Sequence, residues 1–407
     1  MGLKVRTGKY IKSLFVKSIF CCLMIALGCG YLNAQKLDTR QTVVFTSGTE
    51  GHKSYRIPAI VKLPGNDLLA FCEGRVNGSG DFGDINIVMK RSSDHGKTWS
   101  SLHTIVDAAR LQAGNPAPVV DMTDPEYPNG RIFLFYNTGN NHEGEVRKGN
   151  GLREVWYISS VDGGLSWSSA VNITKQVYHP MQPKENAAYN FGEDWRSYAN
   201  TPGHALQIQE GKYRGRMYVA ANHSEGNPKP KSEDYFAHGF YTDDHGKTFH
   251  LSETINLPGG NEATAAEISN GGLLLNARNQ KGDIKARIVA RSNDGGQTWS
   301  SITFDKNLPD PVCEGSILNI GTKKGKKLLA FCNAADTLQR NNLTLRISFD
   351  EGLTWQKNIL IDRIDDKTND YTAYSDLVLI SKKNMGVLFE KDNYKMIVFT
   401  VVHFNRR

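Results

Sequence analysis

Short apolar runs separated by turn residues dominate the chain from about residue 40 onward. Runs such as GNDLLAFCEG, GRIFLFYNTG and GRMYVAANHS follow Gly- or Asn-rich turns and are rich in Leu, Ile, Val, Phe and Tyr. Others, such as EVWYISSVD and KARIVARSND, alternate apolar and polar positions. Short apolar runs indicate buried strands, and alternation indicates strands with one face in water. Because no comparable stretch shows sustained helical periodicity, the pattern predicts an all-β protein.

An eight-residue turn follows five of these strands. It reads SSDHGKTW from Ser92, SVDGGLSW from Ser160, TDDHGKTF from Thr242, SNDGGQTW from Ser292 and SFDEGLTW from Ser348. Its Asp can accept hydrogen bonds from nearby backbone N–H groups, and its Gly permits the positive φ of a tight turn. The closing aromatic ring can be buried between sheets. Five copies do not fit a single catalytic centre, so we expect these Asp boxes to stabilise the fold.

The spacing of the boxes predicts the architecture. They recur at intervals of roughly 50 to 80 residues, and about 370 residues divided by about 60 gives six units. Each unit can hold a four-stranded antiparallel sheet, and radial repetition of such sheets gives a β-propeller. We expect a six-bladed β-propeller of four-stranded antiparallel sheets over residues 35–407, with one blade lacking a recognisable box.

The first 34 residues differ in composition from the rest. They carry five Lys or Arg residues and no acidic residue, and an apolar stretch ends near Ala34. This pattern is typical of a secretory signal peptide, and the apolar stretch is shorter than the roughly 20 residues that cross a bilayer. We expect residues 1–34 to be a signal peptide, no transmembrane span, and export to the periplasm or the medium. The motif ALGC, ending at Cys29, leaves a lipid-anchored cell-surface form as an alternative.

Net charge bears on whether the protein binds nucleic acid, and cysteine content bears on whether it holds a metal or a disulfide. The chain has a net charge of +7, and the leader carries five of the positive charges, which leaves about +2 (7 − 5). A nucleic-acid partner would need a concentrated basic face, so none is expected. Outside the leader, Cys72, Cys313 and Cys332 show no CxxC pair and no metal-ligand spacing, so no metal is expected. Cys72 and Cys332 occupy the similar phrases LLAFCEGR and LLAFCNAA, which favours buried small apolar residues over a disulfide.

The motif YRIPAI, from Tyr55 to Ile60, together with the five boxes resembles the bacterial exo-α-sialidases, or neuraminidases. These are retaining glycosidases with a six-bladed propeller, and the resemblance covers essentially the whole chain after the leader. It implies hydrolysis of terminal sialic acids on glycoproteins, glycolipids or oligosaccharides, by a monomer without a cofactor. A trans-sialidase and a non-catalytic propeller lectin that binds sialic acid are the alternatives.

The resemblance implies a substrate-binding role for four arginines. Arg56 in YRIP, Arg278 in LLLNARN and Arg340 in TLQRNNLTLR match the family's triad, which binds the substrate carboxylate. Arg346, six residues further on, is the alternative to Arg340. Arg75 in CEGR matches a further pocket arginine. Three guanidinium groups suit this task, because they form charge-assisted and partly bidentate hydrogen bonds with a carboxylate.

The same resemblance implies the catalytic residues. Asp81 matches the acid/base aspartate, Glu262 the glutamate beside the nucleophile, and Tyr374 the nucleophile, while Glu390 matches the carboxylate that supports Arg56. A neutral phenol avoids the repulsion that a carboxylate nucleophile would meet from the sugar's own carboxylate, and sialidases are the tyrosine exception among retaining glycosidases. With an ordinary pKa of about 10, the phenol needs a neighbouring base.

Each of these residues has an ordinary structural alternative. Lone arginines in β proteins usually lie on solvated strand faces, and Tyr374 alone could be a core aromatic residue. Glu262 and Glu267 could both be surface charges, and Asp81 competes with Asp84 in a Gly-rich loop where Asp is common. The functional interpretation depends on all eight residues fitting one pattern in the right order.

Overall fold

The structure, a computed structural model, describes residues 41–365 and 370–405. Nearly all regular structure is β, which confirms the predicted fold class. The helices found in these ranges are single turns: α1 (Glu143–Val146), α2 (Thr174–Val177), η1 (Pro230–Ser232) and η2 (Ser269–Gly271). The expected signal peptide, residues 1–34, lies outside the described residues. Within those residues, no helix has the length and apolar character needed to cross a membrane.

Four of the five sheets are separate blades of antiparallel strands. The blade near the C-terminus contains β23 (Thr372–Ser381), β24 (Asn384–Lys391), β25 (Met396–His403) and β1 (Gln41–Thr46). The next contains β19 (Gly315–Lys323), β20 (Lys326–Ala334), β21 (Leu343–Ser348) and β22 (Lys357–Asp362). Another contains β15 (Gly260–Glu267), β16 (Leu273–Asn279), β17 (Ala286–Ser292) and β18 (Ser300–Pro309). The five-stranded blade contains β10 (Trp195–Asn200), β11 (Leu206–Gln207), β12 (Met217–Glu225), β13 (Tyr235–Thr242) and β14 (His250–Leu251).

The fifth sheet has eight strands and corrects one expectation. Its strands are β2 (Ser54–Lys62), β3 (Leu68–Arg75), β4 (Ile85–Ser92), β5 (His103–Val106), β6 (Gln112–Asp121), β7 (Arg131–Gly139), β8 (Arg153–Ser160) and β9 (Val171–Asn172). They form two antiparallel meanders, β2–β5 and β6–β9, linked by a parallel bridge between Ile85 and Gln112. The expectation of six separate four-stranded blades is therefore wrong, because this bridge joins two meanders and β11 adds a fifth strand to another blade.

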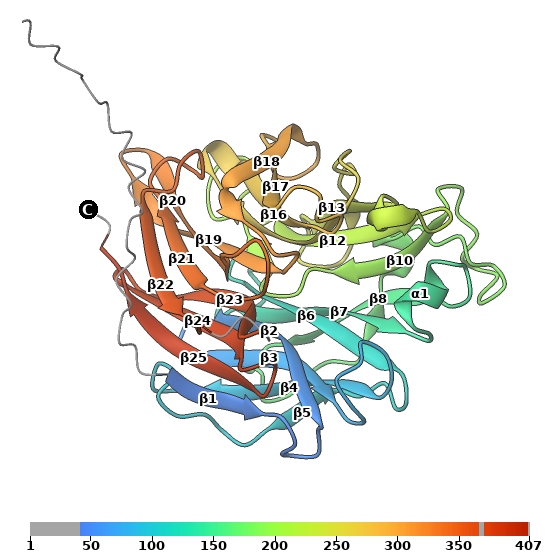
Figure 1. The fold of residues 1–407 in the computed structure, drawn as a ribbon, viewed down its shortest axis with the longest axis horizontal. Helices are drawn as coiled ribbons and strands as arrows, with labels where there is room; N and C mark the ends of the chain where they lie inside the picture. Colours follow the sequence, from blue (N-terminus) through green and yellow to red (C-terminus); the bar gives the residue numbers. More distant parts are fainter. Residues whose placement is uncertain (1–40, 366–369, 406–407) are drawn as a thin grey trace, which may run out of the picture. The chain divides into compact units, whose positions relative to one another are not determined.

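The meanders follow one another around a common centre. We number them along the chain: first (β2–β5), second (β6–β9), third (β10–β14), fourth (β15–β18), fifth (β19–β22) and last (β23–β25 with β1). Strand β2 contacts β6 and β23, β15 contacts β12 and β19, and β19 contacts β23. In Figure 1 the colours accordingly run around the centre from blue β2 to red β25. The arrangement is a β-propeller, as predicted.

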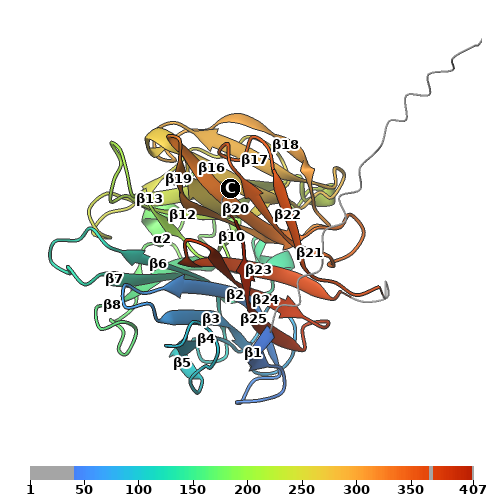
Figure 2. The ribbon, with the colours of Figure 1, turned by 90° about the vertical axis from the view of Figure 1, so that its left-hand side faces the viewer.

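The N-terminal strand closes the ring. β1 pairs with β25, with Gln41 opposite Thr400, and Figure 2 shows these blue and red strands together. In the other five meanders an Asp box joins the last two strands. The last meander instead takes its outer strand from the start of the chain, so it has no such hairpin and no box.

The five boxes share most of their hydrogen bonds: in each, the Thr or Ser four residues after the Asp donates its backbone N–H and its hydroxyl to the Asp carboxylate. In the first, Asp94 Oδ1 accepts from the backbone N–H groups of Lys97 (3.0 Å) and Thr98 (2.9 Å), and Thr98 Oγ1 donates to Asp94 Oδ2 (2.7 Å). The bonds from Thr98 lower the pKa of Asp94 to about 2. Gly96 has a φ of +86°, and Trp99 packs edge-on against Phe399. The geometry supports the expected structural role of the boxes.

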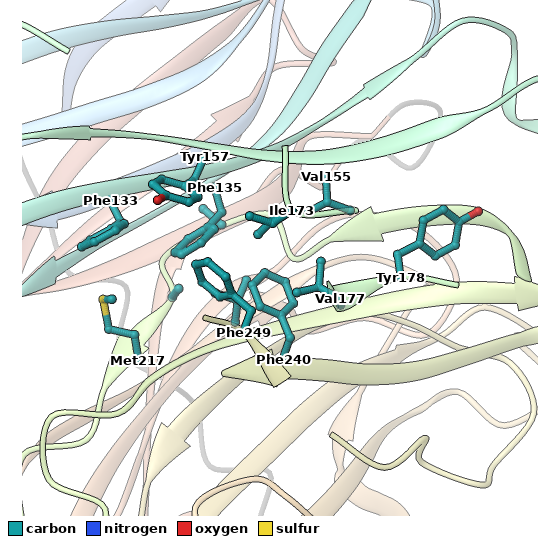
Figure 3. Close-up of a cluster of buried hydrophobic side chains, with 14 of the residues drawn as sticks. Phe133, Phe135, Val155, Tyr157, Ile173, Val177, Tyr178, Met217, Phe240 and Phe249 are labelled. Carbon is teal, nitrogen blue, oxygen red and sulfur yellow. The ribbon is translucent and has the colours of Figure 1, made fainter. Parts of the chain in front are cut away.

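Apolar clusters between neighbouring meanders form the core. Figure 3 shows the cluster between the second and third meanders, where Phe133, Phe135 and Tyr157 meet Phe240 and Phe249. Cys72 and Cys332 are buried and unpaired, as predicted, and so is Cys313, the third cysteine of the described chain.

Candidate active site

An ion pair with Glu390 holds Arg56 in place. Arg56 belongs to the first meander and Glu390 to the last, so the pair joins the two ends of the ring. Arg56 lies on β2 where the strand register shifts, and Ile57 adopts a φ of +62°. Oε1 of the buried Glu390 accepts from Arg56 Nε (2.7 Å) and from the backbone N–H of Ile57 (2.9 Å). Oε2 accepts from Arg56 Nη2 (3.3 Å) and from the backbone N–H of Tyr374 (3.2 Å). Burial alone would lower the pKa of Arg56, but the Glu390 carboxylate outweighs it and keeps the guanidinium charged.

Tyr374, on β23, contacts the side chain of Glu262 from β15. The phenol oxygen lies 2.6 Å from Oε1 and 2.7 Å from Oε2 of Glu262. Arg278 Nη1 donates to that phenol oxygen (2.8 Å) and to Glu262 Oε2 (2.7 Å). Burial raises the pKa of Tyr374 well above 10, and the charge of Glu262 adds to this, against the opposing charges of Arg278 and Arg340. The resting phenol is therefore neutral, with its proton directed at a carboxylate.

Arg340 completes a group of three arginines around Tyr374. It lies between β20 and β21, and its Cζ is 5.4 Å from the centre of the Tyr374 ring, the same distance as the Cζ of Arg56. Arg340 Nη2 donates to the carbonyl of Val312 (3.2 Å), and Nη1 donates to the phenol of Tyr394 (3.1 Å). The predicted triad is thus brought together in space.

Arg346, the alternative to Arg340, points elsewhere. It lies on β21, where its Nη1 donates to Asn333 Oδ1 (2.9 Å). Burial lowers its pKa to about 10. Arg346 does not line the cavity that contains Arg56, Arg278 and Arg340, so the geometry favours Arg340.

Arg75 and Asp81 form an ion pair at the mouth of this cavity. Arg75, at the end of β3, contacts the buried Glu73 through Nη2 (2.7 Å) and Asp81 Oδ1 through Nη1 (2.7 Å). The Asp81 side chain is 75% exposed. Partial desolvation of this carboxylate works against its charge, but the guanidiniums of Arg75 and Arg56 outweigh that effect and lower the pKa of Asp81.

Seven of the eight predicted residues line one cavity of about 280 Å³. The seven are Arg56, Arg75, Asp81, Glu262, Arg278, Arg340 and Tyr374. Glu390 lies behind Arg56 and contacts it without lining the cavity. Residues of the second and third meanders complete the wall, among them Gln112, Asn137, Arg153, Tyr198 and Asn222.

Two residues that the sequence did not single out also support the arginines. The Tyr394 ring lies 4.1 Å from Arg56 Cζ, and its phenol accepts from Arg340. That phenol in turn donates to Asp370 Oδ2 (2.6 Å). Both residues occupy polar turns with no distinctive spacing, so no local sequence signal could have identified them.

These features define a class of protein: a β-propeller with Asp boxes whose sheets surround a cavity lined by arginines and carboxylates. Comparison with protein families matches residues 65–387 to the BNR repeat-like domain. The chain belongs to this family.

Known relatives of this chain include sialidases. It is 30% identical over 375 residues to a sialidase from Micromonospora viridifaciens, which covers 88% of this chain and 52% of that protein. It is 28% identical over 370 residues to a sialidase from Bacteroides fragilis, which covers 84% of this chain and 61% of that protein. A solved structure of a Hadza microbial sialidase matches with a TM-score of 0.74 and 26% identity, over 89% of this chain and 68% of that one. The chain therefore spans between half and two thirds of the length of these two curated relatives.

Proposed function

We propose that the protein is an exo-α-sialidase, a glycoside hydrolase that removes terminal sialic acids with retention of configuration. One observation carries the proposal: the neutral phenol of Tyr374 contacts both oxygens of Glu262 inside a group of three arginines. A phenol paired with a carboxylate can be activated as a nucleophile. A group of guanidiniums beside it selects a substrate that carries an anion at the carbon under attack.

Substrate binding is assigned to the arginines. Arg56, Arg278 and Arg340 would bind the carboxylate on C2 of the sugar, which holds that carbon above the phenol oxygen of Tyr374. The buried pair with Glu390 keeps Arg56 charged and oriented before the substrate arrives, so less reorganisation is needed during the reaction. Arg75 would contact the sugar on the side of Asp81.

The reaction proceeds in two displacements. In the first, the phenol oxygen of Tyr374 bonds to C2 while Glu262 takes the phenol proton, and Asp81 protonates the departing glycosidic oxygen. In the second, a water molecule gives a proton to Asp81 and attacks C2. The bond from C2 to Tyr374 breaks, and the phenol recovers its proton from Glu262. Two inversions at C2 give net retention.

Asp81 must change partner before it can act as an acid. While it contacts Arg75, its pKa is lowered and it holds no proton at neutral pH. Its exposed position lets a bound glycoside displace this contact, and the less charged surroundings would then raise the pKa of Asp81. We assign its proton uptake to this step.

The proposed substrates are sialylated glycoproteins, glycolipids and oligosaccharides. Such substrates lie on cell surfaces and in secretions, which agrees with the export that we propose from the composition of residues 1–34.

Release of 4-methylumbelliferone from its α-sialoside tests the activity, with Tyr374→Phe as the control. Proton NMR of early product tests the stereochemistry, because retention releases the α-anomer first. We expect rapid release by the wild type and α-anomer as the first product. A correctly folded wild type that releases no fluorophore would identify a binding protein instead. The β-anomer as first product would exclude Tyr374 as the nucleophile.

A further inference from the structure

Two neighbouring hairpins, one in the fifth meander and one in the last, are rich in lysine. The hairpin of β19 and β20 contains Lys323, Lys324 and Lys326, and the hairpin of β23 and β24 contains Lys382 and Lys383. All five side chains belong to exposed residues. The equivalent turns of the second and fourth meanders contain no Lys or Arg. These two hairpins therefore concentrate positive charge at one place on the propeller.

Contacts across the two meanders join these lysines into one surface. Strands β19 and β20 contact β23, and Figure 2 shows the orange and red strands side by side. The Nζ atoms of Lys323 and Lys357 lie 5.3 and 5.6 Å from the centre of the Phe349 ring. Lys357 Nζ also donates to the carbonyl of Asn405 (2.5 Å), and the backbone N–H of the preceding residue donates to the carbonyl of Lys383 (2.8 Å). We call six residues the basic surface: Lys323, Lys324, Lys326, Lys357, Lys382 and Lys383.

Acidic residues of the fifth Asp box offset only part of this charge. Oδ1 of Asp350 accepts from the backbone N–H of Thr354 (2.9 Å). Oε1 of Glu351 accepts from the backbone N–H groups of Ser269 (3.0 Å) and Lys327 (3.1 Å). Both carboxylates are therefore engaged in the turns, and the six lysines outnumber them. The net charge of about +2 (7 − 5) did not indicate this surface, because it sums charges over the whole chain after the leader.

The basic surface and the arginine cavity lie at opposite ends of the same strands. On β23, Tyr374 is the third residue and lines the arginine cavity, whereas Lys382 follows the last residue. Between them, Leu377–Leu379 line a second cavity of about 290 Å³ with Leu318 of β19. A strand rises about 3.3 Å per residue, so the eight steps from Tyr374 to Lys382 span about 26 Å. A partner bound to the basic surface therefore leaves the mouth of the arginine cavity open.

An exposed apolar side chain accompanies the lysines. Leu353, in the fifth Asp box, is 62% exposed and lies between Phe349 and Lys357 in the sequence. A lipid bilayer offers anionic headgroups to lysines and an apolar layer to a neighbouring leucine. A soluble polyanion offers charge alone and leaves Leu353 in water. The combination of Leu353 with the lysines therefore favours a bilayer as the partner.

We propose that the basic surface docks the protein on a lipid bilayer that contains anionic headgroups, with the mouth of the arginine cavity directed away from the bilayer. The lysines contact the headgroup phosphates, and Leu353 enters the boundary between headgroups and acyl chains. Attraction between exposed lysines and an anionic bilayer is screened by salt, so the binding weakens as ionic strength rises. The inference concerns another face of the molecule than the proposed catalytic site and does not depend on the proposed function.

The test mixes the full chain with vesicles of phosphatidylcholine alone or of an equimolar mixture with phosphatidylglycerol. Co-sedimentation should occur with the mixed vesicles and should be reversed by high salt. Amine-reactive labelling with mass spectrometry then locates the contact. The lysines of the basic surface should be protected by the mixed vesicles. Lys229 and Lys231, which are exposed beside the cavity-lining Ser232, should stay reactive. Equal labelling of the basic surface with and without vesicles overturns the inference, even if the chain binds through residues 1–34.

Two matched double variants separate the basic surface from net charge. Lys382→Glu with Lys383→Glu should lower the affinity for mixed vesicles by at least about 30-fold, equivalent to about 2 kcal/mol, which is the ordinary contribution of two lysines near an anionic bilayer. Lys229→Glu with Lys231→Glu makes the same change in charge at the cavity end and should leave the affinity within about twofold. An unchanged Tm shows that each variant is folded. Equal losses in the two variants overturn the inference. Binding of the wild type to heparin but not to mixed vesicles also overturns it and assigns the surface to a soluble polyanion.

Discussion

Replacing Glu390 by Gln removes the negative charge beside Arg56 and changes little else in size. In the structure, four N–H groups donate to this carboxylate: Arg56 Nε, Arg56 Nη2 and the backbone N–H groups of Ile57 and Tyr374. An amide has one acceptor oxygen, and its NH₂ group would face two of these donors. The Arg56 side chain is 11% exposed and that of Glu390 0%, so solvent cannot replace the lost contacts.

The expected loss in free energy of unfolding is large for a single substitution. Removing one partner of a buried ion pair costs about 3–5 kcal/mol. Unfolding entropy of about 2.1 cal/mol/K per residue gives about 0.8 kcal/mol/K for the roughly 360 described residues, so Tm should fall by about 4–7 °C. Weakened orientation of Arg56 should cost a further 1.5–3 kcal/mol in substrate binding, because that is about the contribution of a hydrogen bond to a charged group. This corresponds to a fall in kcat/KM of about 10- to 140-fold.

Calorimetry of the protein measures the change in Tm, and steady-state kinetics with an aryl sialoside as substrate measure the changes in kcat and KM. Asp121→Asn is the matched control, because Asp121 is equally buried and accepts from Thr123 Nα, Gln207 Nε2 and His245 Nδ1. Asp121 is the last residue of β6, whereas Gln112, the first residue of the same strand, lines the cavity. The control should lose stability with an unchanged KM. If Glu390→Gln changed neither Tm nor KM, the argument that Glu390 holds Arg56 would be wrong.

Three further predictions follow from the site and the ring. Tyr374→Phe should lower kcat by at least about 1,000-fold, since the nucleophile is lost, while the Kd of a sialic-acid glycal changes little; near-normal turnover would exclude this nucleophile. Arg340→Ala should raise KM by about tenfold or more, whereas Arg346→Ala should leave KM within about twofold; the reverse result would exchange their roles. Burial opposes the charge on His204, but Asp376 at 2.7 Å outweighs it and raises the pKa of His204 above 6.5. The resulting stability is present below about pH 6.5 and is lost as pH rises through the raised pKa, so Tm measured between about pH 6 and pH 9 should fall less in His204→Gln than in the wild type.

The strands and their turns could be predicted because they are local. Alternation of apolar and polar residues identifies a strand from its own sequence, and the Asp box is held by hydrogen bonds within eight residues. The local sequence does not determine which strands share a sheet. The bridge between Ile85 and Gln112 joins two meanders through one residue pair, and no periodicity marks it. The strand pattern therefore predicted the propeller correctly, but it did not predict that the first and second meanders share one sheet.

The site residues, too, could be predicted where a local motif marks them and could not be predicted where only a distant contact does. Arg56, Glu262 and Tyr374 were located through short motifs that resemble a family, and the structure brings them into one cavity. Tyr394 and Asp370 were missed, because each acts through a contact with a distant arginine and occupies an ordinary turn. Residues that support a site by such contacts become visible only when the chain has folded.

The closure of the ring and the formation of the site depend on the same contacts. Arg56 and Glu390 are 334 residues apart in the chain, and they meet only when the first meander packs against the last. The carboxylate that orients Arg56 also accepts from the backbone of Tyr374, so it links the carboxylate-binding arginine to the nucleophile across that junction. An opening between the first and last meanders would therefore separate both functional groups at once. This is why a substitution at Glu390 is expected to lower stability and substrate binding together, whereas the loss of an equally buried carboxylate such as Asp121 lowers stability alone.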